Sequence, residues 1–313
     1  IINHLINNKS TSKTPKMTTR KTMNTTLFSL VVVVIVVFAA TSVNVALADG
    51  DTADYSMTPI DSDKNNIDII QGISEINISP SPPCSGATNA EDDSSFPNTM
   101  FTIFPSEKDG DGVTVETSPA NLVTVSYDYG TLYFKWNTDV SSTATSGGVR
   151  IGVPSDQLLN IRVQGGHKVQ ILDGFTKINT LDTMEGTNTT IQASMTTLNS
   201  TFLELNNNMG QMYVTTNIPV DYSVIQGGGK SWVETPSYNG INVRGIDSDL
   251  QIKGDVDVSS YGGGSVSDDA QLTITGTITG TINTTIDSIV NAPSCDNVNS
   301  TGGGTCNAAP QNV

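Results

Sequence analysis

Carboxylates at alternate positions are the residues in this chain whose spacing could support chemistry. Asp247 pairs with Asp249 and Asp255 pairs with Asp257, and Lys253 lies between the two pairs. Alternate side chains of a β-strand project from one face, so each pair would present two carboxylates together. Two carboxylates across a cleft are the machinery of a glycosidase, and a polysaccharide lyase would add a basic group. If the chain is an enzyme, Asp247, Asp249, Lys253 and Asp255 are its candidate catalytic residues. A solvent-facing acidic edge is the simpler interpretation, because such edges also discourage pairing between sheets.

Other candidates for catalysis or metal binding are few. Arg244 is close to Lys253 in sequence and could supply a second basic group. His167 is the single histidine after residue 48, and no G-x-S-x-G elbow precedes it, so we expect a solvent-facing turn histidine. One histidine also excludes metal centres built from histidine pairs. The run from Asp109 to Gly112 opens like a calcium loop but lacks its remaining ligands. We therefore expect no enzymatic activity and no cofactor, with Ca²⁺ as the open alternative.

Residues 17–48 carry the pattern of a secretory signal peptide. Arg20 and Lys21 form a basic head, residues 27–40 are almost entirely apolar, and Ala46-Leu47-Ala48 is a small-x-small cleavage site. The apolar run is short for a membrane span, which needs about 20 residues, although an uncleaved anchor is the alternative. Residues 1–16 read as sequence upstream of the signal. We expect cleavage after Ala48 and a secreted or cell-surface protein with no stable membrane span.

The exported part of the chain is strongly acidic. Five of the 15 basic residues and none of the 31 acidic residues precede residue 49, which leaves a formal charge of −21. A charge of this sign repels nucleic acid and anionic membranes, so we expect neither as a partner. It also attracts divalent cations, which favours adhesion that depends on calcium or salt.

Cysteines and glycosylation sequons fit an oxidising, extracellular setting. Cys295 and Cys306 flank a Gly-rich loop, and we expect them to form a disulfide. A bridge from Cys84 to either of them is the alternative. The Asn-x-Ser/Thr acceptors of the exported part are Asn77, Asn188, Asn199, Asn283 and Asn299. In a eukaryotic source, some of them would carry glycans on the protein surface.

Composition and alternation predict an all-β fold. Thr, Ser, Asn and Gly are abundant, whereas the residues that favour helices are sparse. Short alternating segments, separated by Gly-, Asp- and Asn-rich breakers, begin near residue 96. We expect residues 49–95 to be an acidic, Pro/Ser-rich linker. Residues 96–291 would then form the folded domain, and residues 292–313 a flexible tail that contains the cysteine pair.

Apolar residues recur with a period of about 20 residues. One series is Ile171, Ile191, Met212, Val233, Ile252 and Ile274, and a second is Ile161, Leu181, Leu203, Val224 and Val243. This period predicts a single-stranded, β-helix-like solenoid in which each rung buries its apolar edge on its neighbours. A β-sandwich or a barrel is the alternative. The alternating threonines from Thr273 to Thr281 would line one face of a Thr-rich edge strand or terminal cap.

The sequence of the predicted strands between residues 100 and 291 resembles a known family, the auto-transporter adhesin head domain, also called the GIN domain. Three features carry the resemblance: the entry pair LVTVSYDYGTLYFKW, the segment VRIGVPSDQLLNIRVQGGHKVQI, and the Asn- and Gly-rich rungs that follow. The resemblance implies a right-handed β-helix-like surface domain whose biochemistry is not established. This chain departs from the pattern in its acidic linker, its cysteine-bearing end and its many sequons.

Two classes of function follow from these observations. The first is a non-enzymatic secreted or surface protein of adhesin or matrix type, which binds glycans or other surfaces through polar strand faces. The second is a carbohydrate-active enzyme on a β-helix, either a polysaccharide lyase or a glycoside hydrolase. The lack of a second histidine and of a clustered acid–base motif favours the first class. A cleft that gathers the acidic pairs with Lys253 and Arg244 would favour the second.

Overall fold

The computed structural model describes residues 56–58, 60–62, 73–78, 98–106, 113–137, 146–184 and 188–308. All of them belong to one compact unit, which spans residues 53–313. The expected signal peptide, the run from Asp109 to Gly112 and Cys84 lie outside the described residues.

The described chain is all-β, with two large mixed sheets that do not close into a barrel and one short 3₁₀ turn, η2 (Ser259–Tyr261). Sheet A contains β1 (Ser56–Met57), β4 (Asn98–Pro105), β5 (Thr114–Ser118), β8 (Ser146–Val153), β10 (Lys168–Ile171), β12 (Thr190–Met195), β14 (Gln211–Thr216), β16 (Lys230–Tyr238), β18 (Asp249–Asp257), β20 (Gln271–Ile274), β21 (Ile278–Thr279), β23 (Ile289–Ala292) and β25 (Thr305–Ala308). Sheet B contains β2 (Ile60–Ser62), β3 (Glu75–Ile78), β6 (Val123–Asp128), β7 (Thr131–Trp136), β9 (Asn160–Gln164), β11 (Thr180–Met184), β13 (Glu204–Asn208), β15 (Tyr222–Gln226), β17 (Ile241–Arg244), β19 (Gly264–Ser267), β22 (Ile282–Thr284) and β24 (Val298–Ser300).

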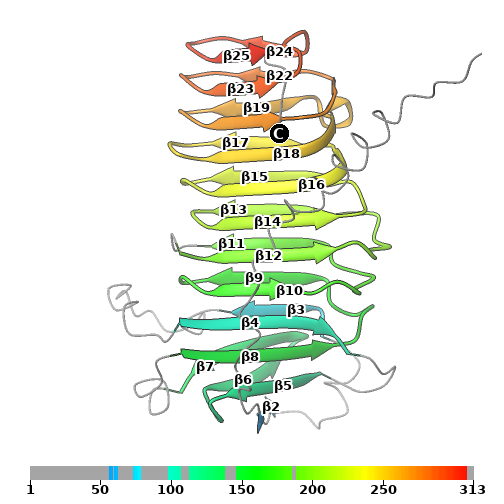
Figure 1. Ribbon diagram of the computed structural model, residues 1–313, viewed down its shortest axis with the longest axis vertical. Coiled ribbons are helices and arrows are strands. Elements are labelled where there is room, and N and C mark those ends of the chain that lie inside the picture. The colour runs from blue at the N-terminus through cyan, green and yellow to red at the C-terminus, as the bar shows by residue number, and fades with distance from the viewer. Residues whose placement is uncertain are drawn as a thin grey trace, which may run out of the picture. The chain divides into compact units, whose positions relative to one another are not determined.

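From β9 onward, the strands alternate between the two sheets, so that each coil of chain gives one main strand to sheet B and one to sheet A (Figure 1). Each strand pairs in parallel with the strand of the coil before and the coil after it. The same parallel pairing continues to β24 and β25. Neighbouring coils therefore lie about 4.8 Å apart along the stack, and side chains of the same phase form columns.

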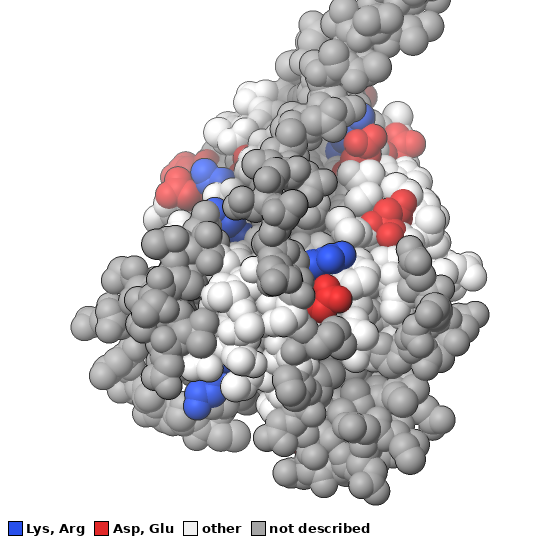
Figure 2. All heavy atoms as spheres, turned by 60° about the horizontal axis from the view of Figure 1, so that its bottom comes forward, with Lys and Arg blue, Asp and Glu red and all other residues white. Residues whose placement is uncertain are grey.

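The N-terminal end of the stack is built differently. Strands β3 and β4 form the first coil, and β7 and β8 pair with them in parallel on the side away from β9 and β10. The next pairs outward, β6 on β7 and β5 on β8, are antiparallel. Because a free parallel edge is a template for further pairing, these strands cap the stack. Figure 2 brings this end forward, and the described basic and acidic side chains visible there are mixed in sign.

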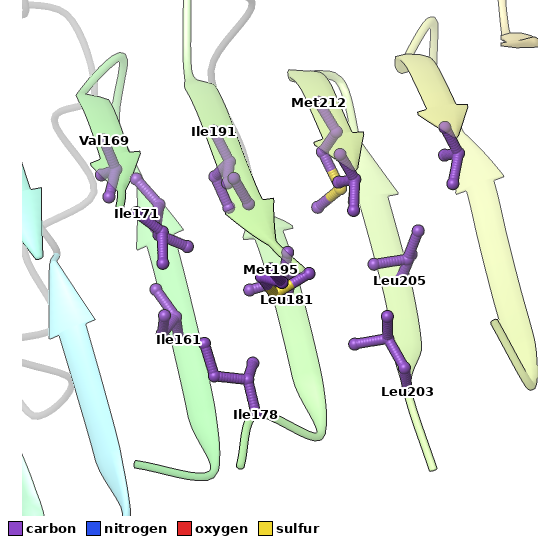
Figure 3. Close-up of a cluster of buried hydrophobic side chains, with 14 of the residues drawn as sticks. Ile161, Val169, Ile171, Ile178, Leu181, Ile191, Met195, Leu203, Leu205 and Met212 are labelled. Atoms are coloured by element: carbon purple, nitrogen blue, oxygen red, sulfur yellow. The ribbon is translucent and has the colours of Figure 1, made fainter. Parts of the chain in front are cut away.

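Sheet A supplies two inward columns to the core between the sheets. One column contains Phe101, Val169, Ile191, Met212, Ser231, Leu250, Leu272 and Val290, and the other Ile103, Ile171, Ala193, Val214, Val233, Ile252 and Ile274. The first predicted series is therefore buried on one face throughout, but it divides between the columns, with Ile191 and Met212 in the first (Figure 3). The number of residues per coil varies, so a fixed step along the sequence does not always reach the register partner. A residue two positions from that partner lies in the other column but still faces the core.

The second predicted series is partly wrong. Ile161 and Leu181 stack directly, and Leu203 and Val243 are buried. Val224, however, projects outward, because Ser223 and Ile225 on either side of it face the core. The register of β15 with β13 and β17 aligns Val224 with Asn206 and Asn242, two outward residues. The pairing of three strands outweighs the preference of one valine for the interior.

Asn207 is a buried polar residue that joins three coils. Its Oδ1 accepts hydrogen bonds from Thr183 Oγ1 at 2.7 Å and from the Gly210 backbone N–H at 3.0 Å. Its Nδ2 donates to the Lys230 carbonyl oxygen and to Ser231 Oγ, both at 2.9 Å. A fully satisfied amide of this kind is stabilising inside a protein, whereas a half-satisfied one is costly. The interior is therefore pinned by polar contacts as well as by apolar packing.

Residues 292–308 add strands to both sheets, where the sequence predicted that residues 292–313 form a flexible tail. Strands β24 and β25 extend both sheets by one coil, and Cys295 and Cys306 form the expected disulfide within it. The segment from 49 to 95, predicted to be a linker, contributes β1, β2 and β3. The threonine run is divided among β20, β21 and β22, so it does not form one strand with a continuous hydroxyl face.

Substitutions at two neighbouring residues of β15 test the register. Ile225→Ala should lower the free energy of unfolding by about 2 to 5 kcal/mol, because it leaves a cavity in the core. Val224→Ala should cost less than about 1 kcal/mol, because this side chain lies on the outer face. Denaturant unfolding of both variants measures the difference, and the reverse ranking would refute the register described here.

Removal of the disulfide should loosen the last coil alone. A double Cys295→Ser, Cys306→Ser variant loses a loop constraint worth about 2 to 3 kcal/mol by the chain-entropy estimate. Amide hydrogen exchange should rise in β24 and β25 while β14 and β16 stay protected, since each coil contacts mainly its neighbours. Cys84→Ser is the matched control and should change neither region. Peptide mapping without reductant would contradict the pairing if it found Cys84 in a bridge.

Candidate functional site

The outer face of sheet A carries a groove of about 380 Å³ that crosses the middle of the sheet. Five neighbouring strands, β12, β14, β16, β18 and β20, supply its walls. The outward side chains that line it are Gln192, Ser194, Tyr213, Thr215, Trp232, Glu234, Gln251, Lys253, Thr273 and Thr275. Each of these residues is next in sequence to a core residue, and successive side chains of a strand point to opposite faces. Packing of the core residues therefore fixes the positions of the groove residues.

An aromatic pair forms the centre of the groove. Tyr213 and Trp232 are register partners on β14 and β16, and their rings stack with centroids 4.6 Å apart and planes 2° from parallel. Parallel rings touch at roughly 3.5 Å, so a centroid distance this long requires a lateral offset. Part of each ring face is therefore not covered by the other ring, and Tyr213 is 40% exposed. Its hydroxyl donates to Gln211 Oε1 at 3.3 Å.

Amide side chains flank the aromatic pair along the same column. Gln192 of β12 is aligned with Tyr213, and Gln251 of β18 is aligned with Trp232. The Gln251 Nε2 donates to Asp249 Oδ2 at 2.9 Å, which orients that amide. Along this column the order is therefore Gln192, Tyr213, Trp232 and Gln251. The two rings form an apolar surface, and an amide that can form hydrogen bonds lies at each end of it.

The neighbouring column carries the charges of the groove. Glu234 Oε1 and Lys253 Nζ form an ion pair of 3.1 Å, and both side chains are more than half exposed. The same two residues and Thr215 also line a second hollow of about 430 Å³, which adjoins the first. The ion pair therefore lies between two concave regions of one surface.

A β-bulge shapes the second hollow. Two residues of β16, Thr235 and Pro236, stand opposite the single residue Gly254 of β18. The pairing register between the two strands therefore shifts by one residue at this point. Gly254 has a φ of 151°, and a Cβ there would collide with the carbonyl oxygen of Thr235. Only glycine fits this position, where the register between the two strands shifts.

The predicted catalytic residues do not gather in one cleft. Asp247 is exposed in the turn before β18, Asp249 begins that strand, and Lys253 lies in the groove. Asp255 follows the bulge, where the Thr277 backbone N–H and hydroxyl both donate to its Oδ1 at 2.8 Å. These hydrogen bonds hold the pKa of Asp255 below its ordinary value, the opposite of what a general acid needs.

Arg244 lies on the other sheet. It projects from β17 and donates to Gln226 Oε1 through both Nε, at 2.9 Å, and Nη2, at 2.6 Å. Among the candidate catalytic residues and Arg244, only Lys253 lines the groove, and its partner Glu234 was not among the candidates. Tyr213 and Trp232 were also missed, although their separation of 19 residues matches the period of the core series.

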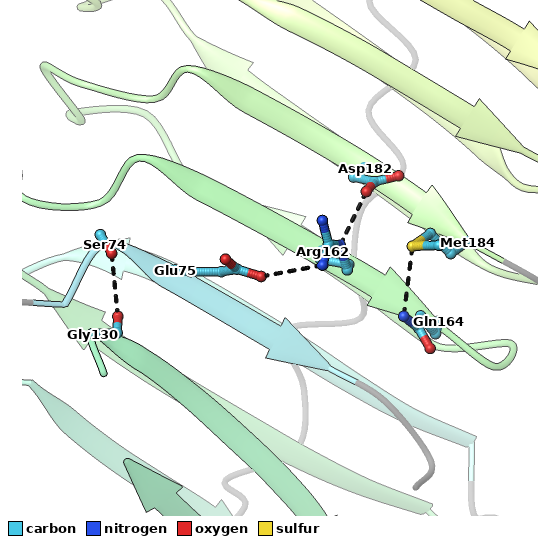
Figure 4. Close-up of polar contacts among 7 residues, drawn as sticks. All are labelled: Ser74, Glu75, Gly130, Arg162, Gln164, Asp182 and Met184. Carbon is cyan, nitrogen blue, oxygen red and sulfur yellow. Dashed lines mark hydrogen bonds and ion pairs between the residues drawn. The ribbon is translucent and has the colours of Figure 1, made fainter. Parts of the chain in front are cut away.

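A second charged cluster lies on the outer face of sheet B (Figure 4). Arg162 on β9 pairs with Glu75 of β3 at 3.6 Å and with Asp182 of β11 at 3.0 Å. Burial raises the pKa of Asp182, and the hydrogen bond and charge of Arg162 act against that rise. The guanidinium thus ties three consecutive strands together, which is a structural role.

His167 is buried, and the prediction of a solvent-facing histidine is wrong. Its ring lies against Phe101 in an edge contact, with centroids 5.7 Å apart, and against Trp136 at 5.5 Å. The tight turn at Gly165 and Gly166 directs the side chain inward, where it is 5% exposed. Burial lowers the pKa of His167 to about 4, so the ring is neutral at physiological pH.

The described residues contain no group of three or more His, Cys, Asp or Glu side chains that could hold a metal ion. The run from Asp109 to Gly112, which opens like a calcium loop but lacks its remaining ligands, lies outside that part of the chain. None of the helical structure in the described ranges is long and apolar enough to cross a membrane. Among the sequons, Asn188, Asn199 and Asn299 are exposed, Asn283 is half-buried and Asn77 is 8% exposed.

Comparison with known protein families gives no match, and no curated protein is matched either. Several solved structures are similar to this chain at low sequence identity. A "putative adhesin" from Parabacteroides merdae ATCC 43184 is 13% identical, with a TM-score of 0.47 over 80% of this chain and 94% of that chain. A "putative lipid binding protein" from Parabacteroides distasonis ATCC 8503 is 9% identical, with a TM-score of 0.43 over 81% and 95%. A "putative adhesin" from Bacteroides fragilis NCTC 9343 is 10% identical, with a TM-score of 0.33 over 76% and 93%.

The buried His167 predicts a specific pH dependence of stability. The unfolded chain binds a proton on this ring near pH 6.5, while the folded protein resists protonation until about pH 4. The contribution to stability is complete above the unfolded pKa and is lost as the pH falls from 6.5 to 4, by about 3 kcal/mol. His167→Phe keeps the aromatic packing and cannot titrate, so its unfolding free energy should fall less over this range. Equal slopes for the two proteins, measured by denaturant unfolding, would show that the ring is not buried in solution.

Proposed function

We propose that this chain is a secreted or cell-surface binding protein of adhesin or matrix type, built as a β-solenoid with rungs of roughly 20 residues. Its ligand is an extracellular glycan, and the groove of sheet A is the binding site. The observation that carries the proposal is the aromatic pair Tyr213–Trp232, exposed in a concave surface and flanked by two glutamine amides.

The chemistry of the groove suits a sugar. Sugars present apolar C–H faces, which pack on aromatic rings, and hydroxyl groups, which bond to amides. Binding sites for small ligands combine an apolar concave surface with a few convergent polar groups, as this groove does. The stacked rings are held by backbone pairing on rigid strands, so little conformational entropy is lost when a ligand binds.

Binding without catalysis is supported by the placement of the carboxylates. Among the described lining residues of the groove, Glu234 is the one carboxylate, and it is paired with Lys253. A glycosidase needs two carboxylates on either side of the scissile bond. The alternative function, a polysaccharide lyase or glycoside hydrolase, would have to draw its second group from Asp247, Asp249 or Asp255.

The extracellular setting has two structural supports. The disulfide between Cys295 and Cys306 is of a kind that persists in oxidising compartments. The exposed sequons Asn188, Asn199 and Asn299 are open to glycosylation in a eukaryotic host. Both features agree with the predicted signal peptide.

The experiment that tests the function is a screen of the exported chain against a polysaccharide panel, with binding and release of reducing ends measured together. Trp232→Ala should weaken binding by roughly tenfold or more, because it removes one of the two aromatic rings of the groove. Tyr261→Ala is the matched control. Tyr261 is an exposed aromatic that contacts Tyr222 of sheet B, and its loss should leave binding unchanged.

Three outcomes would contradict the proposal. Binding that survives Trp232→Ala but disappears in Tyr261→Ala would place the site elsewhere. Absence of binding to every polysaccharide would exclude glycan recognition. Release of reducing ends that is abolished by Glu234→Gln or Asp255→Asn would promote the enzymatic alternative.

A further inference from the structure

The charge of the groove differs from the charge of the chain. The whole sequence has a formal charge of −16, yet the described groove lining contains one anion and one cation, which are joined in an ion pair. The other lining side chains carry amides, hydroxyls or aromatic rings. The groove is therefore an electrically neutral strip on an acidic protein.

This distribution disfavours an anionic ligand. Among the described lining residues, a polyanion would meet a single cation, Lys253, whose ammonium lies 3.1 Å from the Glu234 carboxylate. That carboxylate would stand next to the ligand's own charge, which is unfavourable, and the net negative field of the protein would add to the repulsion. An uncharged ligand has neither cost.

The direction of the groove restricts the ligand further. The walls come from five successive strands, and the amide–ring–ring–amide column runs across those strands. Five strands span about 19 Å at the usual strand spacing. A ligand that contacts both Gln192 and Thr273 is thus an extended chain that lies along the axis of the stack.

We propose, building on the glycan-binding function above, that the groove takes an uncharged, linear polysaccharide segment. Tyr213 and Trp232 pack against its C–H faces, while Gln192 and Gln251 bond to its hydroxyls. This assignment replaces the cation-bridged contact that the net charge alone suggested, because the described lining of the groove holds one carboxylate, Glu234, and Lys253 already neutralises it.

The test compares neutral linear polysaccharides, such as xylan and β-glucan, with anionic ones, such as polygalacturonate and alginate, by calorimetry at low and high salt. We expect a neutral polysaccharide to bind with an affinity that changes less than about twofold with salt, since no charge is paired across the interface. Affinity for its oligosaccharides should rise with length until the groove is spanned and then level off. Chelation of divalent cations should have no effect.

Two variants separate the possible results. Trp232→Ala should reduce binding roughly tenfold or more. Tyr261→Ala, which lies outside the groove, should retain binding of the neutral chain within about twofold. Binding of anionic polysaccharides alone, with an affinity that falls with salt and is lost in Lys253→Ala, would overturn this inference and leave the glycan-binding function intact. No binding to any member of either set would instead refute the function itself.

Discussion

Parallel backbone pairing between successive coils is the constraint on which the described structure depends. Each strand must keep the in-and-out phase of the strands beside it, since a slip of one residue would turn every core side chain outward. The phase is maintained by the columns of Ile, Leu and Val on the inner faces and by the four hydrogen bonds of Asn207. The same register also aligns the outward side chains of neighbouring strands, and for this reason the rings of Tyr213 and Trp232 stack.

The sequence predicted the properties that depend on composition and period. The all-β class, the stacking of Ile161 on Leu181 and the pairing of Cys295 with Cys306 all agree with the structure. Val224 and His167 were misplaced because their positions depend on partners distant in sequence. The register of three strands turns Val224 outward, and a glycine turn directs His167 into an aromatic cluster.

The candidate site was harder to predict than the fold. The alternate spacing of carboxylates suggested that Asp247 and Asp255 act together, yet Asp247 lies in the turn before β18 and Asp255 lies beyond the bulge of β16. The aromatic pair left only a faint signal, two large residues 19 positions apart. The two rings meet because the register of β14 and β16 aligns Tyr213 with Trp232, and that register depends on strand pairing rather than on the separation alone. The neutrality of the groove was also hidden in the sequence, because Glu234 and Lys253 form their ion pair only when β16 and β18 are paired.

Modular growth is a consequence of this architecture. Because each coil contacts mainly its two neighbours, a duplicated coil could be spliced into the middle of the stack without disturbing the antiparallel cap or the disulfide at the far end. Insertion of a single residue within a strand has no such freedom, because it would turn the following side chains to the other face. A gene encoding this fold can therefore lengthen in whole repeats, and each repeat that preserved the outer column would extend the groove by about 4.8 Å. Ligand length would then be set by a count of repeats, and ligand chemistry by the side chains of one column.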